Sequence, residues 1–139
     1  MDIEQTKAEI KKEEGFRMET YKCTEGHLTG GYGHKMLEGE IPPTDMAGWT
    51  KLFERDFARA MSGAEELLMI CPNVDDTARH IVVEMCYQMG GYGVSKFHGM
   101  LSALQESDYV TASKEMLDSR WAKQTPKRAN RMAERMRNI

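Results

Sequence analysis

The stretch that decides the fold runs from Glu13 to His34 and reads EEGFRMETYKCTEGHLTGGYGH. The apolar residues before Gly15 are spaced as on a short helix, and glycine commonly ends such a helix. After Gly15, short runs of Tyr, Thr and Leu are interrupted by glycines, which is typical of short strands joined by tight turns. The stretch therefore predicts a helix that ends at Gly15 and a small hairpin sheet that extends to His34.

Glu14 is the last residue of this predicted helix. It follows Ile10 by four residues and so lies on the same inward-facing side. A carboxylate on that side is costly unless it has a partner or a function. Its position alone favours an ordinary solvated Glu at a helix end, because exposed Glu is the norm.

A long helix is predicted after the loop-like segment 38–43. Thr44 is a suitable N-cap residue, and apolar residues then recur every three or four positions, as on the buried face of a helix. The recurring residues are Trp49, Leu52, Phe53, Phe57, Ala60, Met61, Ala64 and Leu68. A helix of this length can join two lobes.

Helices also dominate the prediction for the C-terminal half. Asp75 and Asp76 can cap a helix that we expect to stop at Gly90 and Gly91. Further helical stretches are predicted around 96–104, 110–117 and 127–136, and Pro126 marks the start of the last. The pattern as a whole is mainly helical with one small sheet.

The composition is that of one ordinary globular domain. The chain has 139 residues, 19 Lys and Arg, 22 Asp and Glu, and 40% hydrophobic residues. The three cysteines, Cys23, Cys71 and Cys86, form no CxxC pair, so we expect synthesis in a reducing compartment and no metal site. No signal peptide and no apolar stretch of about 20 residues is found, and we expect no stable membrane insertion.

The charge is unevenly distributed. The formal net charge is −3, which argues against general nucleic-acid binding. From Arg120 to the end, however, the chain carries seven Lys or Arg residues and one acid, Glu134. Such a basic end is usually a solvated helical face, although it can also attract the chain to an anionic cell wall.

The stretch 13–34 resembles the catalytic segment of the phage-type lysozymes of glycoside hydrolase family 24. These enzymes share Glu-Gly-x-Arg, then Tyr, Glu-Gly, Thr and Gly-x-Gly-His. Two further blocks, YQMGGYGVSKF (87–97) and SRWAKQTPKRANR (119–131), match the same family in the same order. The resemblance implies an α+β, mainly α, lysozyme-like two-lobed domain over 1–139. Residues 1–43 would form an N-terminal lobe with a helix and a small sheet, and 44–139 the long connecting helix and a helical C-terminal lobe.

The resemblance also implies an activity. The chain would be an endolysin that hydrolyses the β-1,4 bond between N-acetylmuramic acid and N-acetylglucosamine in bacterial peptidoglycan. Glu14 would be the general acid and Thr29 would help to place the attacking water. We expect a monomer without cofactors that stays in the host cytoplasm until it is released to the cell wall.

Cys23 is the main departure from the family, which normally has Asp at this position. A plain thiol with a pKa of about 8.5 would polarise water only weakly at neutral pH. A thiolate could activate water or attack the anomeric carbon. The third alternative is a small, half-buried hydrophobic residue without a role, which is usual for free Cys.

Two structural pairs are implied by the resemblance. His34 would pair with Asp56, which lies on the apolar side of the long helix, where a carboxylate needs a cation. Arg128 would approach Glu14. From spacing alone, Asp56 could instead be solvated and never meet His34.

Five further residues correspond to cleft positions where the family contacts sugar or peptide, namely Tyr21, Glu25, Tyr87, Gln88 and Arg120. Aromatic faces suit sugars, and an amide can both donate and accept hydrogen bonds. Taken singly, Tyr87 and Gln88 could merely finish a helix. Lys35 stands where the family has Leu.

Two alternative functions remain open from the sequence. A peptidoglycan-binding protein could keep the cleft but lose hydrolysis together with the second carboxylate. A lytic transglycosylase needs only one acid and would leave anhydro-sugar ends. Turnover on purified cell wall and analysis of the product ends discriminate between the three.

Overall fold

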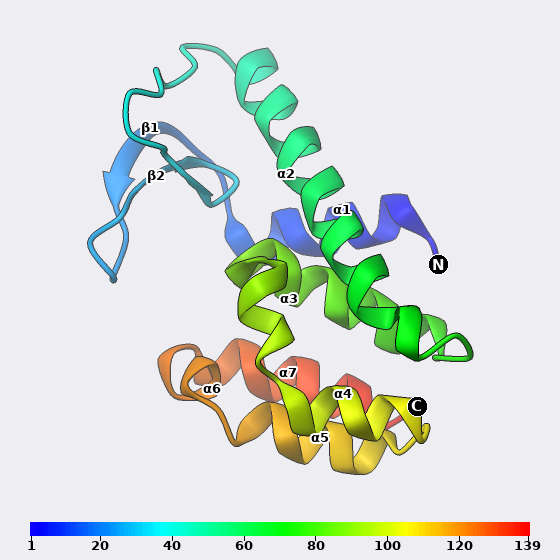
Figure 1. Cartoon of the computed structure of the whole chain (residues 1–139). Coiled ribbons are helices and arrows are strands. Elements are labelled where there is room, and N and C mark those ends of the chain that lie inside the picture. Colours follow the sequence, from blue (N-terminus) through cyan, green and yellow to red (C-terminus); the bar gives the residue numbers. More distant parts are fainter. The chain divides into compact units, whose positions relative to one another are not determined.

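The computed structural model describes all 139 residues and is mainly α, with one small antiparallel sheet, as predicted (Figure 1). The chain divides into two compact units. One comprises Ile3–Arg59, and the other comprises Ala60–Ile139 together with Met1–Asp2. No helix combines the length and the apolar character that crossing a bilayer requires.

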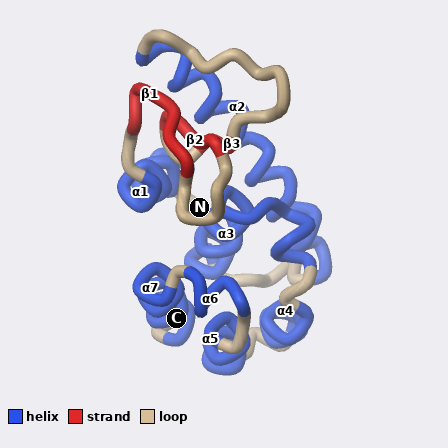
Figure 2. Tube along the Cα trace, turned by 90° about the vertical axis from the view of Figure 1, so that its left-hand side faces the viewer, coloured by secondary structure: helices blue, strands red, loops and turns tan.

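The N-terminal unit contains one helix, the sheet and the first part of a long helix. These elements are α1 (Ile3–Glu14), β1 (Arg17–Lys22), β2 (Leu28–Gly31), β3 (His34–Lys35) and α2 (Met46–Leu67). The strands are antiparallel in the order β1-β2-β3, and a loop leads from β3 to α2 (Figure 2). The predicted helix end before Gly15 and the predicted hairpin sheet are thus confirmed.

Trp49 of α2 fixes the sheet in this unit. Its side chain is 1% exposed, and its indole N–H donates a hydrogen bond to the carbonyl of Met18, at 2.8 Å. The ring lies close against β2, where a Cβ atom built on Gly30 would lie 2.8 Å from Trp49 Cζ2. Glycines in this strand therefore allow an aromatic ring to pack directly on the backbone.

The C-terminal unit is entirely helical. It contains the end of α2, a 3-10 turn (Leu68–Ile70), α3 (Asp76–Ser95), α4 (His98–Gln105), α5 (Tyr109–Leu117), α6 (Arg120–Gln124) and α7 (Pro126–Arg137). Helix α5 packs against both α4 and α7 (Figure 1). Flexible methionines fill much of this core, because Met85, Met100, Met116, Met132 and Met136 are all buried.

Two predicted helix boundaries are wrong. The cap of α2 is Asp45 and not Thr44, since Asp45 Oδ1 accepts the N–H of Gly48 at 2.8 Å and the helix begins at Met46. Helix α3 does not stop at the glycines. Gly90 leaves the helical conformation, with φ 80° and ψ 154°, and the helix then resumes to Ser95.

A buried charge joins α3 to α7 in the C-terminal unit. The Glu84 side chain is only 1% exposed, and its Oε2 accepts a bond from Arg135 at 2.8 Å. His80 Nε2 lies 3.0 Å from the same oxygen. Burial raises the pKa of Glu84, but the bonds from His80 and Arg135 outweigh this effect and keep the pKa below its usual value.

Candidate functional site

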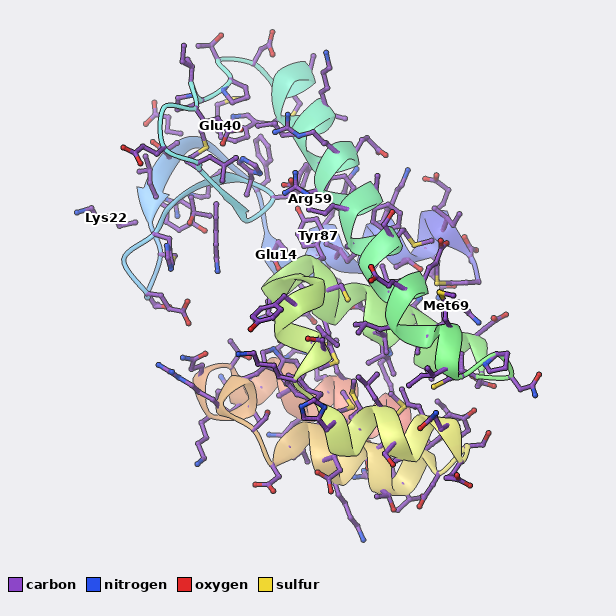
Figure 3. The ribbon with its side chains drawn as sticks, viewed as in Figure 1. Glu14, Lys22, Glu40, Arg59, Met69 and Tyr87 are labelled. Atoms are coloured by element: carbon purple, nitrogen blue, oxygen red, sulfur yellow. The ribbon has the colours of Figure 1, made fainter.

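Glu14 sits at the C-terminal end of α1, and its carboxyl group lies against the turn between β2 and β3 (Figure 3). A Cβ atom built on Gly33 would lie 2.9 Å from Glu14 Cδ. Gly33 has φ +69°, a conformation that side-chain-bearing residues rarely adopt. The Glu14 carboxyl group can lie this close to the turn only because residue 33 is a glycine.

Cys23 lies in the turn between β1 and β2. Its N–H donates to the carbonyl of His27 at 2.8 Å, and its own carbonyl accepts the N–H of Gly26 at 2.8 Å. Cys23 is half-buried, whereas Cys71 and Cys86 are buried in the C-terminal unit. Of the three thiols, Cys23 is the most accessible to a substrate or reagent.

The surroundings of Cys23 favour its ionised form. The pKa of the Cys23 thiol is lowered, mainly by a hydrogen bond from the backbone N–H of Glu25. Burial opposes the change, while the backbone N–H of His27, the hydroxyl of Thr29 and the charge of Lys35 add to it. The Cys23 thiol therefore ionises more readily than an ordinary thiol, and its role in the reaction stays a prediction.

Thr29 is brought to the same face of the sheet as Tyr21 and Cys23. Thr29 is 3% exposed and stands directly opposite Tyr21 in the ladder. Tyr21 precedes Cys23 by two residues, so the two side chains are on the same face. Its hydroxyl donates to the carbonyl of His27, at 3.1 Å. Glu25 is exposed in the adjoining turn. Tyr21, Cys23, Glu25 and Thr29, all proposed from the sequence, therefore lie together around the turn between β1 and β2.

His34 and Asp56 meet in the N-terminal unit. His34 Nδ1 lies 2.6 Å from Asp56 Oδ2. A third residue, which the sequence analysis missed, completes the group, since His34 Nε2 lies 2.8 Å from Glu40 Oε1 (Figure 3 labels Glu40 in the loop before α2). Glu40 also accepts the N–H of Leu37 at 3.0 Å and pairs with Arg55 at 3.3 Å.

The arrangement requires a protonated His34. Each ring nitrogen faces a carboxylate oxygen, and only the imidazolium can donate from both nitrogens. The hydrogen bond to Asp56 raises the pKa of His34, burial lowers it, and the bond to Glu40 raises it further, so the pKa lies above its ordinary value. Burial raises the pKa of Glu40, but the Leu37 N–H and the charge of His34 reverse this, so its pKa is lowered.

In the C-terminal unit, Gln88 of α3 is held by Trp121 of α6. The indole N–H of Trp121 donates to Gln88 Oε1 at 2.9 Å, and Trp121 itself packs edge-on against Phe97. Because the Gln88 oxygen already accepts this bond, its NH₂ group remains to donate. The role expected for Gln88 in substrate binding stays a prediction, and the bond from Trp121 fixes the orientation of its amide group. Trp121 was missed, although its place directly after Arg120 in the third matching block was a signal.

The remaining predicted residues also belong to the C-terminal unit. Tyr87 is half-buried near the kink of α3, Arg120 is exposed at the start of α6, and Arg128 is half-buried in α7. The approach of Arg128 to Glu14 joins residues of the two units and stays a prediction. No group of three or more His, Cys, Asp or Glu side chains has the arrangement needed to hold a metal ion.

Comparison with known proteins finds one family model, described as phage lysozyme, that matches residues 11–138. A probable T4-type lysozyme 2 from Dictyostelium discoideum is 34% identical, with 88% of each chain covered. A second protein from the same organism, a probable T4-type lysozyme 1, is 31% identical over the same shares. The pre-baseplate central spike protein Gp5 of Enterobacteria phage T4 is also 31% identical, over 88% of this chain but only 26% of that protein.

Proposed function

Because this chain belongs to the phage lysozyme family and is therefore a glycoside hydrolase of peptidoglycan, we propose that Glu14 and Cys23 together cleave its β-1,4 bond between N-acetylmuramic acid and N-acetylglucosamine. One observation carries this assignment. Both groups come from the same compact unit, where Glu14 lies on the turn after β2 and Cys23 lies in the turn before it. Glycoside hydrolysis needs two such groups, a proton donor and a partner that stabilises or traps the sugar cation.

Glu14 is the proton donor in this proposal. The bond between the anomeric carbon and the bridging oxygen breaks as the Glu14 carboxyl group gives its proton to that oxygen. A general acid must be held at a fixed place relative to this oxygen. The contact with Gly33 supports the role, because it limits where the carboxyl group can lie.

Ionised Cys23 replaces the second carboxylate. As a base, the thiolate takes a proton from a water molecule, and the resulting hydroxide attacks the anomeric carbon with inversion. As a nucleophile, it forms a carbon–sulfur bond that water, deprotonated by Glu14, later breaks, with net retention. In either case we assign Thr29, on the same face of the sheet, to help hold the water by accepting a hydrogen bond from it, since its own proton goes to the His27 carbonyl.

Gln88 contributes to substrate binding through its free N–H groups. These groups select an acceptor, such as an acetamido or peptide carbonyl or a carboxylate, and peptidoglycan carries all three. Tyr21 and Tyr87 offer ring faces that suit the C–H surfaces of sugars. Glu25 and Arg120 are exposed charges that suit the polar groups of the stem peptide.

The first test replaces Glu14 by Gln, which keeps the shape of the side chain and removes the acidic proton. We expect lysis of purified sacculi to fall at least about 100-fold with the fold intact, since general acid catalysis typically contributes this much. Glu4→Gln, on the exposed side of the same helix, is the matched control and should retain full activity. More than about a tenth of the activity in Glu14→Gln would remove Glu14 as the general acid.

The second test addresses Cys23. Cys23→Ala should lose most turnover, Cys23→Asp should stay active, and the buried-thiol variant Cys71→Ala should keep its activity per folded molecule. Intact mass spectrometry after a rapid quench shows a sugar adduct only if Cys23 is the nucleophile. Full activity in Cys23→Ala would contradict both chemistries, and anhydro-sugar product ends would identify a transglycosylase instead.

A further inference from the structure

Lys35 stands on the same face of the sheet as Cys23, Thr29 and Tyr21. Residues directly opposite each other in antiparallel strands point to the same side. Thr29 is opposite Tyr21 on one side and opposite Lys35 on the other, so the three residues form a row across the sheet. Cys23 follows Tyr21 by two positions, and its N–H continues the ladder to His27, which places its side chain on this face as well.

Lys35 is the cation of this row. The Cys23 pKa is lowered by several groups, and two of them are fixed hydrogen-bond donors, the backbone N–H groups of Glu25 and His27. The Thr29 side chain, whose hydroxyl proton goes to the His27 carbonyl, contributes less. Lys35 is the fourth group, and it acts through its charge. A lysine at this place fits a thiol partner better than the apolar residue that the phage-type family has there, because a cation favours a thiolate over a thiol.

We propose that Lys35 is a positioning residue of the reaction, whose ammonium group stabilises the thiolate of Cys23 across the sheet. The inference rests on the proposed function of Cys23. It adds a role that the sequence alone did not suggest, since Lys35 stood out there only as a departure from the Leu of the family. The other ionisable groups near Cys23 are Glu25 and His27 of the same turn and Tyr21 of β1.

The size of the effect follows from Coulomb's law. Two unit charges about 5–10 Å apart in water change the ionised fraction of a thiol about two- to fourfold, which is about 0.3–0.6 pH unit in its titration midpoint. Both side chains are accessible to solvent, so the effect is screened by salt and should shrink towards zero in about 1 M salt.

The test measures the titration midpoint of Cys23 in Lys35→Met, which removes the charge and keeps the length. The intact chain is treated with iodoacetamide over pH 5–10 at low salt, and peptide mass spectrometry isolates the signal of Cys23. We expect the midpoint to rise by about 0.3–0.6 unit, and to be restored in Lys35→Arg. The matched control is Lys22→Met. Lys22 is exposed and stands opposite Leu28, one position along the ladder from Tyr21 and Thr29, so its side chain points to the other face of the sheet.

Turnover on sacculi separates this inference from the proposed function. In Lys35→Met the alkaline shift of the midpoint should appear as an equal shift in the rising limb of the pH–rate profile. An unchanged Cys23 midpoint, or the same shift in Lys22→Met, would overturn the pairing. A shifted midpoint with an unshifted rate profile would overturn the role of Lys35 in the reaction, whereas full turnover in Cys23→Ala would overturn the function proposed for Cys23 itself.

Discussion

Replacing His34 by Asn should destabilise the N-terminal unit strongly at pH 6 and weakly at pH 9. The substitution removes a cation that two carboxylates share, Asp56 at 2.6 Å and Glu40 at 2.8 Å. Asn donates from a single nitrogen instead of two ring nitrogens on opposite sides, and it carries no charge. Two partly buried carboxylates, on α2 and on the loop before it, would then face each other without a compensating charge.

The loss of stability in His34→Asn can be estimated from the two hydrogen bonds that it removes. A hydrogen bond to a charged group contributes about 1.5–3 kcal/mol, so two bonds give an upper bound of about 3–6 kcal/mol. The Asp56 and Glu40 side chains are 15% and 17% exposed, and this access to water reduces the penalty. We expect a loss of about 2–4 kcal/mol at pH 6, or about 8–15 °C in Tm for a chain of this size.

The pH dependence follows from the two pKa shifts. The His34 pKa is raised, so its contribution is complete below the unfolded value of about 6.5 and is lost as pH rises through the higher folded value. The Glu40 pKa is lowered, so its contribution is present above about 4.5 and is lost as pH falls through the lower folded value. The difference between wild type and His34→Asn should therefore be largest at about pH 5–6.5.

Urea unfolding of both proteins at several pH values measures this difference. His98→Asn is the matched control, because His98 is exposed at the start of α4 and should change stability by less than about 0.5 kcal/mol. Double-mutant cycles should show a larger coupling of His34 to Asp56 than to Glu40, which keeps Leu37 and Arg55 as partners. A His34→Asn penalty that stays constant from pH 5 to pH 9 would refute the shared-cation argument.

Two further substitutions, each with a control variant, test the contact of Glu14 with Gly33 and that of Glu84 with Arg135. Gly33→Ala and Gly39→Ala both place a side chain at positive φ and should each cost about 1–2 kcal/mol in thermal unfolding. Only Gly33→Ala also collides with Glu14, so it alone should reduce turnover, by about tenfold or more, and equal turnover in the two variants would contradict the positioning of Glu14. Arg135→Met should lose about 2–4 kcal/mol in urea unfolding, because it leaves the buried Glu84 carboxylate with His80 as its only basic partner. The exposed Arg137→Met should be nearly neutral, and equal losses in the two variants would argue against the contact between α3 and α7.

Local patterns predicted most of the fold. Gly15 ended α1, and the glycine-broken run up to His34 became a sheet, because both depend on backbone preferences that act over a few residues. The misplaced cap of α2 shows the limit of such rules. Thr44 and Asp45 are adjacent and both can cap, and only the three-dimensional position of the Gly48 N–H decides between them. Helix α6 is five residues long and too short to show a periodic pattern.

The residues of the candidate site were harder to predict, because they meet through contacts between positions far apart in the sequence. His34 and Asp56 lie 22 residues apart, and the family resemblance, not spacing, suggested that they meet. Glu40 could not be foreseen as the third member, since a carboxylate in a loop belongs to no periodic pattern. The lowered pKa of Cys23 was equally hidden, because the N–H groups that lower it come from the backbone and have no signature in residue type.

Each compact unit contains one of the two tryptophans, and the two indoles have different hydrogen-bond partners, the carbonyl of Met18 for Trp49 and the amide of Gln88 for Trp121. The chain therefore carries one intrinsic fluorophore for each unit. Trp49→Phe leaves an emission signal that reports only on the helical unit, and Trp121→Phe leaves one that reports only on the sheet-containing unit. If the two signals change at the same denaturant concentration, then the units unfold as one cooperative system, and if they change separately, the difference measures how independently each unit is stable.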